Sequence, residues 1–278
     1  MSLDLARVAA ALGRSSTRAK PLRGGDICRA WRLDTPAGPV FVKGHARPPE
    51  GFFDAEAAGL EALRSAPGGP RVPSVLGVAP TWLALEWLDA VPVSDGGRAL
   101  GRALAALHRH GTGSHGGAAP NFIGTLGQPN RPWTSWEACL REDRLRPQLT
   151  LARDQLGPAL AGQAERLLGR LGELVPAHPH AAQLHGDLWG GNWMQTACGP
   201  AVFDPAAAKG HREVDLAMMA LFGGFPPGTW QAYDDAWPLE PGAEERRPLY
   251  QLYPLLVHVN LFGGGYVAQV ADVVRRYV

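Results

Sequence analysis

Three things are scarce in this 278-residue sequence, and each scarcity excludes a class of protein. Its three cysteines, Cys28, Cys139 and Cys198, lie far apart, and no two have the spacing of metal ligands; they suit a reducing cytosol. No apolar run approaches the roughly 20 residues that cross a bilayer. Net charge is also scarce, because 27 Lys and Arg residues face 26 Asp and Glu residues. No overall field therefore marks the chain as a binder of nucleic acid or of a membrane surface.

The N-terminal segment lacks the features of a signal peptide. Residues 1–16 contain Asp4 and no long apolar core, and they predict a short amphipathic helix with Leu5, Val8, Ala9 and Leu12 on one face. With 45% hydrophobic residues, the chain is expected to fold into a globular protein. We therefore predict a cytoplasmic protein without a membrane or nucleic-acid partner, in which a local site must hold any anionic ligand.

The first ninety residues are predicted to be β-rich with one helix. An antiparallel hairpin is indicated by the alternation in "ICRAWRLDT", the turn "PAG" and the strand "PVFVKG". A helix follows in "FFDAEAAGLEALRSA", which is rich in Ala, Leu and Glu and is ended by "PGGP". The apolar "TWLALEWL" predicts a central strand.

The rest of the chain is predicted to be mostly helical. Helical spacing of apolar residues occurs in "GRALGRALAALHRHG", "PALAGQAERLLGRLGELV", "EVDLAMMALFGG" and "LYQLYPLLVHVNLFG". We therefore predict an α+β fold of two lobes: residues 1–90 with a small antiparallel sheet and one main helix, and residues 91–278 with the helices. A connector at about 86–92 joins them, and clefts between lobes commonly bind small molecules.

The segment "LHGDLWGGNW" concentrates groups that can carry chemistry. Asp187 precedes Asn192 by five positions, and Asp204 ends the apolar strand "PAVF". Their oxygens suit Mg²⁺, which also takes phosphate oxygens. The pattern D-x-x-x-x-N followed by a strand-end Asp is typical of phosphoryl-transfer enzymes. Asp187 by itself could equally be a turn or cap residue, and it is the presence of the other two that favours catalysis.

Upstream residues match what a nucleotide requires. Lys43 ends the strand "PVFVK", and Glu56 lies thirteen residues further on in the predicted helix, so the two could form the pair that positions the α- and β-phosphates. An edge-strand lysine beside an ordinary helical glutamate is the alternative. Gly24 and Gly25 could let backbone N–H groups close over phosphates, or could simply form a hairpin turn.

Further residues are assigned to adenine, to the acceptor and to structural support. The connector would offer the backbone of Glu86 and Leu88 to an adenine edge. Trp189 could form a wall for the acceptor. Structural support is predicted for His185, His211 and Asp215, of which the last would cap a helix or brace the catalytic loop.

The order of several segments resembles the fructosamine kinase (ketosamine kinase) family. The resemblance is carried by "HGDLWGGN", "FDPAAAKGHREVDLAMMALFGGFP", "RGGDICRAWRLDTPAGPVFVK", "FFDAEAAGLEAL" and "WTSWEACLREDRLRPQL". The related aminoglycoside and choline phosphotransferases share the H-G-D-x-x-x-x-N core. Two departures from the family are Gly190, where serine is common, and the alanines in "DPAAAKGH", where bulkier residues are common.

This resemblance implies a protein-kinase-like fold, ATP and Mg²⁺. The expected reaction places a phosphoryl group on the sugar 3-hydroxyl of a ketosamine, a small molecule or a glycated protein lysine, as a step in deglycation repair. By position, Asp187 resembles the catalytic Asp, Asn192 and Asp204 the metal ligands, and Lys43 and Glu56 the phosphate-positioning pair.

The acceptor site is predicted in "NFIGTLGQPN", where Asn121, Gln128 and Asn130 could bind sugar hydroxyls, or could belong to an ordinary surface loop. One alternative function is a phosphotransferase for an aminoglycoside or a choline-like amine. Such cations call for an acidic pocket, which the neutral and basic groups here do not suggest. Another alternative is a non-catalytic kinase-like module that binds nucleotide.

Overall fold

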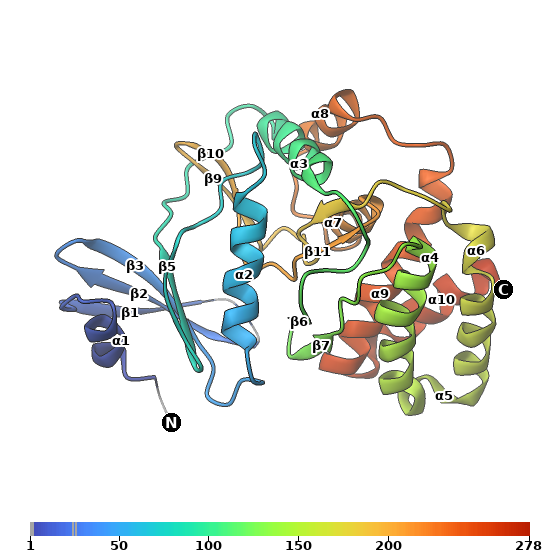
Figure 1. The fold of residues 1–278 in the computed structure, drawn as a ribbon, viewed down its shortest axis with the longest axis horizontal. Helices are drawn as coiled ribbons and strands as arrows, with labels where there is room; N and C mark the ends of the chain where they lie inside the picture. The colour runs from blue at the N-terminus through green and yellow to red at the C-terminus, as the bar shows by residue number, and fades with distance from the viewer. Residues whose placement is uncertain (1–2, 24, 26) are drawn as a thin grey trace.

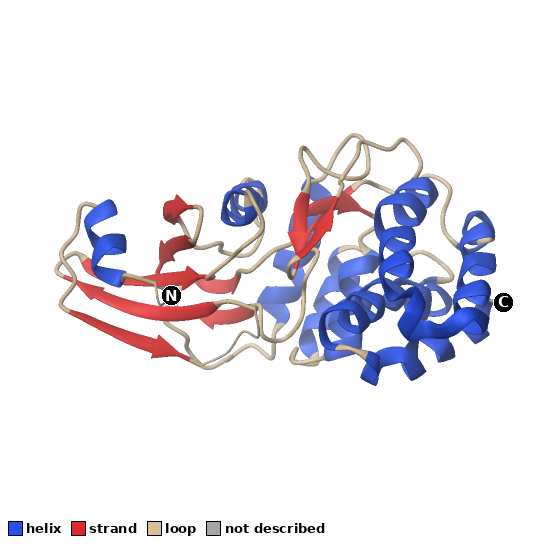
Figure 2. Ribbon diagram, turned by 90° about the horizontal axis from the view of Figure 1, so that it is seen from below, coloured by secondary structure: helices blue, strands red, loops and turns tan. Residues whose placement is uncertain are grey.

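The computed structural model describes residues 3–23, 25 and 27–278 and confirms the α+β fold (Figure 1). One side is a five-stranded antiparallel sheet with the strand order β1-β2-β3-β5-β4. Figure 2 shows the sheet at one end of the molecule and most helices gathered at the other. The sheet and its two helices are α1 Leu5–Ala11, β1 Arg18–Leu22, β2 Arg29–Thr35, β3 Gly38–Gly44, α2 Phe52–Arg64, β4 Val75–Ala79 and β5 Trp82–Glu86.

The sheet is covered on both faces because its strands alternate buried side chains between them. Val40 and Val42 of β3 pack with Val8 of α1, whereas Leu83 and Leu85 of β5 pack against α2. The predicted hairpin is confirmed, with Thr35 opposite Gly38 and Ala30 opposite Lys43. Alternation therefore places Lys43 on the face that carries α2.

The remaining elements build the helical body. They are α3 Arg98–His110, β6 Asn121–Ile123, β7 Leu126–Gln128, α4 Trp136–Cys139, the π-helix η1 Leu140–Leu145, α5 Arg146–Gly169, α6 Leu171–Leu174, β8 Ala182–Leu184, β9 Trp193–Thr196, β10 Gly199–Val202, β11 Ala208–Gly210, α7 Glu213–Phe222, α8 Gly228–Ala236, α9 Ala243–Phe262, the 3-10 helix η2 Gly264–Tyr266 and α10 Val267–Tyr277. Short antiparallel pairs join β6 to β7, β8 to β11 and β9 to β10. Among the residues that the structure describes, none of the helices has the length and apolarity to span a bilayer.

The helices predicted from apolar spacing are present, and several short elements come in addition. Strands β4, β6, β7, β8 and β11 and helices α4 and α8 were not predicted, because each is short or lacks a clear period. Helix α10 was also not predicted, although its buried residues Val270, Val273 and Val274 have helical spacing. Helix α5 is broken at Gly157, whose φ of 72° is left-handed, and Pro158 starts its second half. That second half, with α6, covers the helix expected in "PALAGQAERLLGRLGELV".

One hydrophobic cluster crosses the connector. Leu83 from the sheet and Leu100, Leu188 and Val202 from beyond residue 91 are fully or almost fully buried in the same cluster. The connector between β5 and α3 is itself held to β9, since the Val91 N–H donates to the Gln195 carbonyl at 2.8 Å. The sheet and the helical body therefore share packing through α2, α3 and the catalytic loop.

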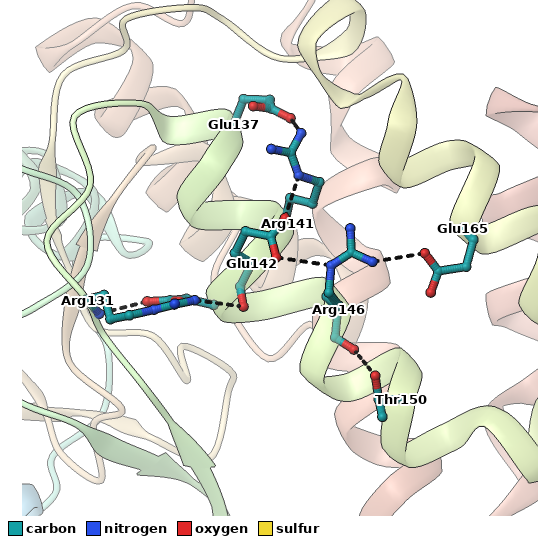
Figure 3. A network of polar contacts seen from close by, with 8 residues as sticks. Arg131, Glu137, Arg141, Glu142, Arg146, Thr150 and Glu165 are labelled. Carbon is teal, nitrogen blue, oxygen red and sulfur yellow. Dashed lines mark hydrogen bonds and ion pairs between the residues drawn. The ribbon is translucent and has the colours of Figure 1, made fainter.

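An ion-pair network fixes the segment from β7 to α5 (Figure 3). Arg146 reaches Glu142 at 3.0 Å and Glu165 at 3.1 Å, which links η1 to the second half of α5. Arg131 donates its backbone N–H to the buried Asp143 at 2.7 Å and its Nε at 2.8 Å. Solvent-exposed pairs contribute little stability, so the buried Asp143 is the anchor of this network.

Candidate active site

The loop of residues 186–192, which we call the catalytic loop, begins with a glycine that no other residue could replace without backbone strain. Gly186 has a φ of 82°, and a Cβ atom there would lie 2.1 Å from the Ala206 carbonyl oxygen. The loop after β8 thus runs directly against the segment after β10. This close approach brings Asp187 next to Asp204.

Asp215, in the first turn of α7, holds the catalytic loop by hydrogen bonds to its backbone. Its carboxylate accepts the backbone N–H of His185 at 2.7 Å and that of Gly186 at 2.9 Å. His108 of α3 lies 3.2 Å from the same carboxylate and 2.7 Å from the Tyr233 hydroxyl. Asp215 therefore accepts hydrogen bonds from two backbone N–H groups that would otherwise be buried without partners.

His185 joins the two halves of the site. Its Nε2 donates to the Phe203 carbonyl at 3.0 Å, and its Nδ1 accepts the Asp187 N–H at 3.3 Å. Burial lowers the pKa of His185, so the imidazole is neutral, as this pair of contacts requires. The side chain does not line the cavity, and its contacts are those of a support residue.

Asn192 connects the two acids. Its Nδ2 donates to the Asp187 carbonyl at 2.8 Å and to the Asp187 carboxylate at 3.1 Å. Its own carbonyl accepts the Phe203 N–H at 3.1 Å, next to Asp204. Asp204 has a φ of 57°, a left-handed conformation that a non-glycine residue rarely adopts. The backbone therefore turns sharply at Asp204, where β10 has ended.

Lys43 bridges both halves of the molecule. Its Nζ lies 2.9 Å from Glu56 of α2 and 3.1 Å from Asp204. Burial alone would lower the pKa of Lys43, but the carboxylates of Asp204 and Glu56 outweigh it, so the pKa is raised and the ammonium stays charged. Burial raises the pKa of Glu56, and Lys43 opposes that rise.

Asp187 has an environment suited to a base. Burial, followed by the nearby charge of Asp204, raises its pKa to about 7, while the Asn192 hydrogen bond and Lys43 oppose the rise. A carboxylate whose pKa is close to neutral pH accepts a proton far better than one with an ordinary pKa.

These groups open into one cavity of about 870 Å³. Of the residues singled out in the sequence, those that line it are Gly25, Lys43, Glu56, Asn121, Asp187, Trp189, Asn192 and Asp204. Gly24 lies outside the described residues. Glu86 and Leu88 do not line the cavity, and the Glu86 side chain instead accepts the Ser74 N–H at 3.2 Å and pairs with Arg71. Their contact with adenine stays a prediction.

Gln128 and Asn130 are placed differently from the prediction. Both are buried away from the cavity, and both donate their amide N–H to the Asn121 oxygen, at 2.9 and 2.7 Å. The Asn130 side-chain oxygen accepts from Arg144 at 2.5 Å, and the Gln128 side-chain oxygen accepts from the Tyr253 hydroxyl at 2.6 Å. Because these polar groups are already paired inside the protein, Gln128 and Asn130 are not available to sugar hydroxyls. Neither are they part of a surface loop.

The absence of a side chain at Gly190 has a structural reason. Its N–H donates to the Gly223 carbonyl at 3.0 Å, and a Cβ atom on Gly190 would lie 2.7 Å from the Cα of Gly224. The catalytic loop and the loop after α7 therefore approach too closely for any side chain. A serine at this position would require the two loops to separate.

The sequence did not identify the wall made by α7 and α9. Met218 and Phe222 of α7, with His258 and Phe262 of α9, line the cavity. Trp189 and Phe262 remain 43% and 49% exposed although both are large and apolar. The available signal was that α9 is apolar on most sides, yet this does not tell which side faces a cavity.

His211 supports the fold rather than the catalytic loop. Its Nδ1 lies 2.8 Å from the Tyr250 hydroxyl of α9, and that hydroxyl also accepts from Trp136 at 3.1 Å. The hydroxyl therefore donates to a neutral imidazole. Burial, with Arg246 and Arg212 nearby, lowers the pKa of His211 to about 3.

This pKa predicts acid sensitivity. A histidine that stays neutral in the folded state but titrates near 6.5 when unfolded contributes full stability above pH 6.5, and that stability is lost as the pH falls toward 3. By pH 5 we expect a loss of about 2 kcal/mol of unfolding free energy from this residue. Urea unfolding at several pH values should show a shallower acid dependence in His211→Gln. The exposed His110→Gln is the control, and an unchanged slope in His211→Gln would contradict the assignment.

The oxygen donors fit a divalent ion that is shared with phosphates. In the part of the chain that the structure describes, no three His, Cys, Asp or Glu side chains could hold a metal by themselves. Asn192 uses Nδ2 toward Asp187, which leaves its Oδ1, and the Asp204 side chain is 36% exposed. Mg²⁺ characteristically takes one or two protein oxygens and completes its shell with phosphate oxygens and water.

A strand lysine paired with a helix glutamate, together with an Asp–Asn loop and a strand-end Asp around one cavity, defines a protein-kinase-like phosphotransferase. The chain belongs to the fructosamine kinase family, whose sequence model matches residues 5–278. It is thus a kinase, an ATP-dependent phosphotransferase.

Comparison with known sequences and solved structures supports this family assignment. The chain is 43% identical over 252 residues to a probable ketoamine kinase of Thermus thermophilus, with 90% of each chain covered. It is similar to a solved structure from Thermobifida fusca described as a candidate fructosamine-3-kinase, with a TM-score of 0.90, 38% identity and coverage of 97% and 98%. An aminoglycoside phosphotransferase solved with AMP-PNP and hygromycin B shares the fold at a TM-score of 0.64 and 19% identity, with 99% of each chain covered.

Proposed function

We propose that this kinase transfers the γ-phosphoryl group of ATP to the sugar 3-hydroxyl of ketosamines. The observation that carries the proposal is the meeting of Asp187, Asn192 and Asp204 with the Lys43–Glu56 pair in a single cavity. The family supports the ketosamine acceptor. Phosphorylation would make the adduct unstable, so the activity would serve deglycation. The free cysteines suit a reducing compartment, and we place the activity in the cytoplasm.

Each residue has one task in the proposed mechanism. Lys43, held by Glu56, binds the α- and β-phosphates. Asp187 accepts a hydrogen bond from the attacking hydroxyl and takes its proton late, because phosphoryl transfer passes through a loose transition state. Asn192 and Asp204 would hold Mg²⁺, which supplies charge neutralisation on the phosphate oxygens. Gly25 borders the same end of the cavity and could cover the phosphates with its backbone.

Residues 1–90 and 91–278 are proposed to act as two lobes that close on the substrates. Closure would exclude water, which is the competing nucleophile. Trp189 borders the cavity and is proposed to contact the acceptor. Asn121 also lines the cavity, but its amide donates to the Ala207 carbonyl at 2.8 Å and accepts from Gln128 and Asn130, so its proposed role is to shape the acceptor side.

The charge of the cavity favours ketosamines over the other acceptors considered. Its carboxylates are Glu56, Asp187 and Asp204, and all three are grouped around Lys43 and Asn192. An aminoglycoside with several ammonium groups would find no further carboxylate along the described lining. A non-catalytic role is disfavoured because the base, the metal donors and the phosphate-binding lysine are all in place.

A phosphorylation assay tests this function. Ribulose-, erythrulose- and fructose-lysine should be compared at equal concentration. The rate is measured from the release of ADP, and ³¹P NMR of the product locates the phosphate. We expect transfer to O3 of at least one adduct well above the acceptor-free ATPase blank. Transfer to an aminoglycoside or to choline, with none to the three adducts, would show that the acceptor class is wrong.

A further inference from the structure

The cavity extends well beyond the reacting groups along one face of α9. Tyr253 lies at the Asp187 end, and Val257, His258, Leu261 and Phe262 continue the lining toward the C-terminus of the helix. Nine residues of α-helix cover about 13 Å. A sugar that presents its hydroxyl to Asp187 would occupy only part of that length, so the far part must receive another portion of the acceptor.

Four aromatic rings form the far part of this wall, which we call the His258 cluster: Phe222, His258, Phe262 and Tyr266. The His258 ring stacks on Phe222 with centroids 4.6 Å apart and lies 5.3 Å from Phe262 and 4.9 Å from Tyr266. The negative faces of such rings attract organic cations, and their area favours apolar groups.

The two ends of the cavity differ in charge. Glu56, Asp187 and Asp204 are all drawn together around Lys43 and Asn192. The His258 cluster contains no carboxylate. A cation bound there would be held by ring faces and by neutral hydrogen-bond acceptors instead of an ion pair.

His258 supplies such an acceptor. Its Nδ1 donates to the Pro254 carbonyl at 2.7 Å, because a carbonyl can only accept. The proton is therefore on Nδ1, and Nε2 keeps its lone pair. No partner for Nε2 is found within residues 3–23, 25 and 27–278, and burial lowers the pKa of His258, which keeps the ring neutral.

We propose that the His258 cluster binds the amine end of the acceptor, with the protonated secondary nitrogen against the rings and His258 Nε2, and with an apolar substituent along Phe262. This inference rests on the proposed function and narrows its preferred substrates to ketosamines whose amine carries an extended apolar substituent. Phe262 is 49% exposed, so the substituent passes from the rings toward solvent. An adduct on a lysine side chain has the required alkyl chain.

Two adducts of one sugar that the enzyme accepts, one on methylamine and one on benzylamine, test the proposal. We expect the wild-type enzyme to have a roughly tenfold lower KM for the benzylamine adduct, because an apolar group of that size gains about this factor in a fitting pocket. Phe262→Ala should remove this advantage for the benzylamine adduct and leave the KM for MgATP within twofold. Because Phe262 is 49% exposed, the variant is expected to fold normally.

His258→Phe keeps a ring and removes Nε2. It should raise the KM of both adducts several-fold with little change in kcat, because both carry the same nitrogen. Leu151→Ala, an exposed apolar residue of α5 outside the cavity, is the matched control and should change nothing.

Equal kcat/KM for the two adducts in the wild type would overturn the inference while the proposed function stands. So would a Phe262→Ala variant that keeps the wild-type preference, or a His258→Phe variant with wild-type KM for both adducts. Absence of transfer to any ketosamine would contradict the proposed function itself, and the inference with it.

Discussion

Asp187→Ala should lower kcat by about 10³-fold while MgATP still binds with nearly wild-type affinity. A positioned base of this kind contributes about 10²- to 10⁴-fold. Asp187 is a carboxylate whose pKa burial and the charge of Asp204 raise to about 7, and Glu56, whose pKa is also raised, is already paired with Lys43. In the proposed mechanism the phosphates are bound by other groups, Lys43 and the metal donors, so the affinity for MgATP should survive. Steady-state kinetics with the acceptor and isothermal titration with a non-hydrolysable ATP analogue would measure the two effects separately.

Asp154→Ala provides the control for this experiment. Asp154 is an exposed carboxylate on α5, away from the cavity, and its removal should leave kcat unchanged. A wild-type circular dichroism spectrum and a cooperative urea transition in the Asp187→Ala variant would show that the fold is intact. Turnover within a few-fold of wild type in a folded Asp187→Ala variant would disprove the assignment of the base.

Asp204→Ala should weaken MgATP binding by about 100-fold or more. A metal-bound phosphate interaction is worth several kcal/mol, and each 1.4 kcal/mol corresponds to a tenfold change in affinity. The effect should depend on the metal. Titrations of ATP with Mg²⁺ and with EDTA would therefore show a large difference between variant and wild type only in the presence of Mg²⁺.

Lys43 makes this comparison informative. In the wild type, Lys43 contacts both Asp204 and Glu56, and without Asp204 it would keep its contact with Glu56. The EDTA titration therefore reports the lysine contact with the phosphates. Unchanged MgATP affinity in Asp204→Ala would mean that this carboxylate is not a metal ligand.

The catalytic loop was predictable because its signal is contiguous. Asp187 and Asn192 lie in one turn, and their spacing fixes a local geometry that the structure shows as two hydrogen bonds from one amide. The β2–β3 hairpin was predictable for the same reason, since alternation and a short turn act over a few residues. Lys43 followed from its place at the end of that hairpin.

The network around Asn121 could not be predicted from its own segment. Gln128 and Asn130 are routine loop residues by type, and what buries them is contact with Arg144 and with Tyr253, which is 125 positions from Gln128. Sequence proximity suggested three parallel sugar ligands. The fold instead buries the amides of Gln128 and Asn130. Because buried polar groups need partners, these amides form hydrogen bonds inside the protein.

The brace under the catalytic loop also depends on distant partners. A support role for Asp215 could be inferred from its place at the start of α7, whereas His108, 107 positions away, carries no local sign that it reaches the same carboxylate. The cavity wall made by α7 and α9 is a further case. Helix α9 is apolar on several faces, and only its packing determines that His258 and Phe262 face the cavity.

By itself, the sequence determined the fold class, the family resemblance and the residues proposed for phosphoryl transfer, because those depend on residue type and short spacing along the chain. The tertiary structure alone decided which polar side chains stay open to the cavity, which are consumed by internal hydrogen bonds, and that the cavity continues along α9 to the aromatic rings. These outcomes depend on contacts between segments far apart in the chain, and the burial they impose sets both the pKa of Asp187 and the neutrality of His258.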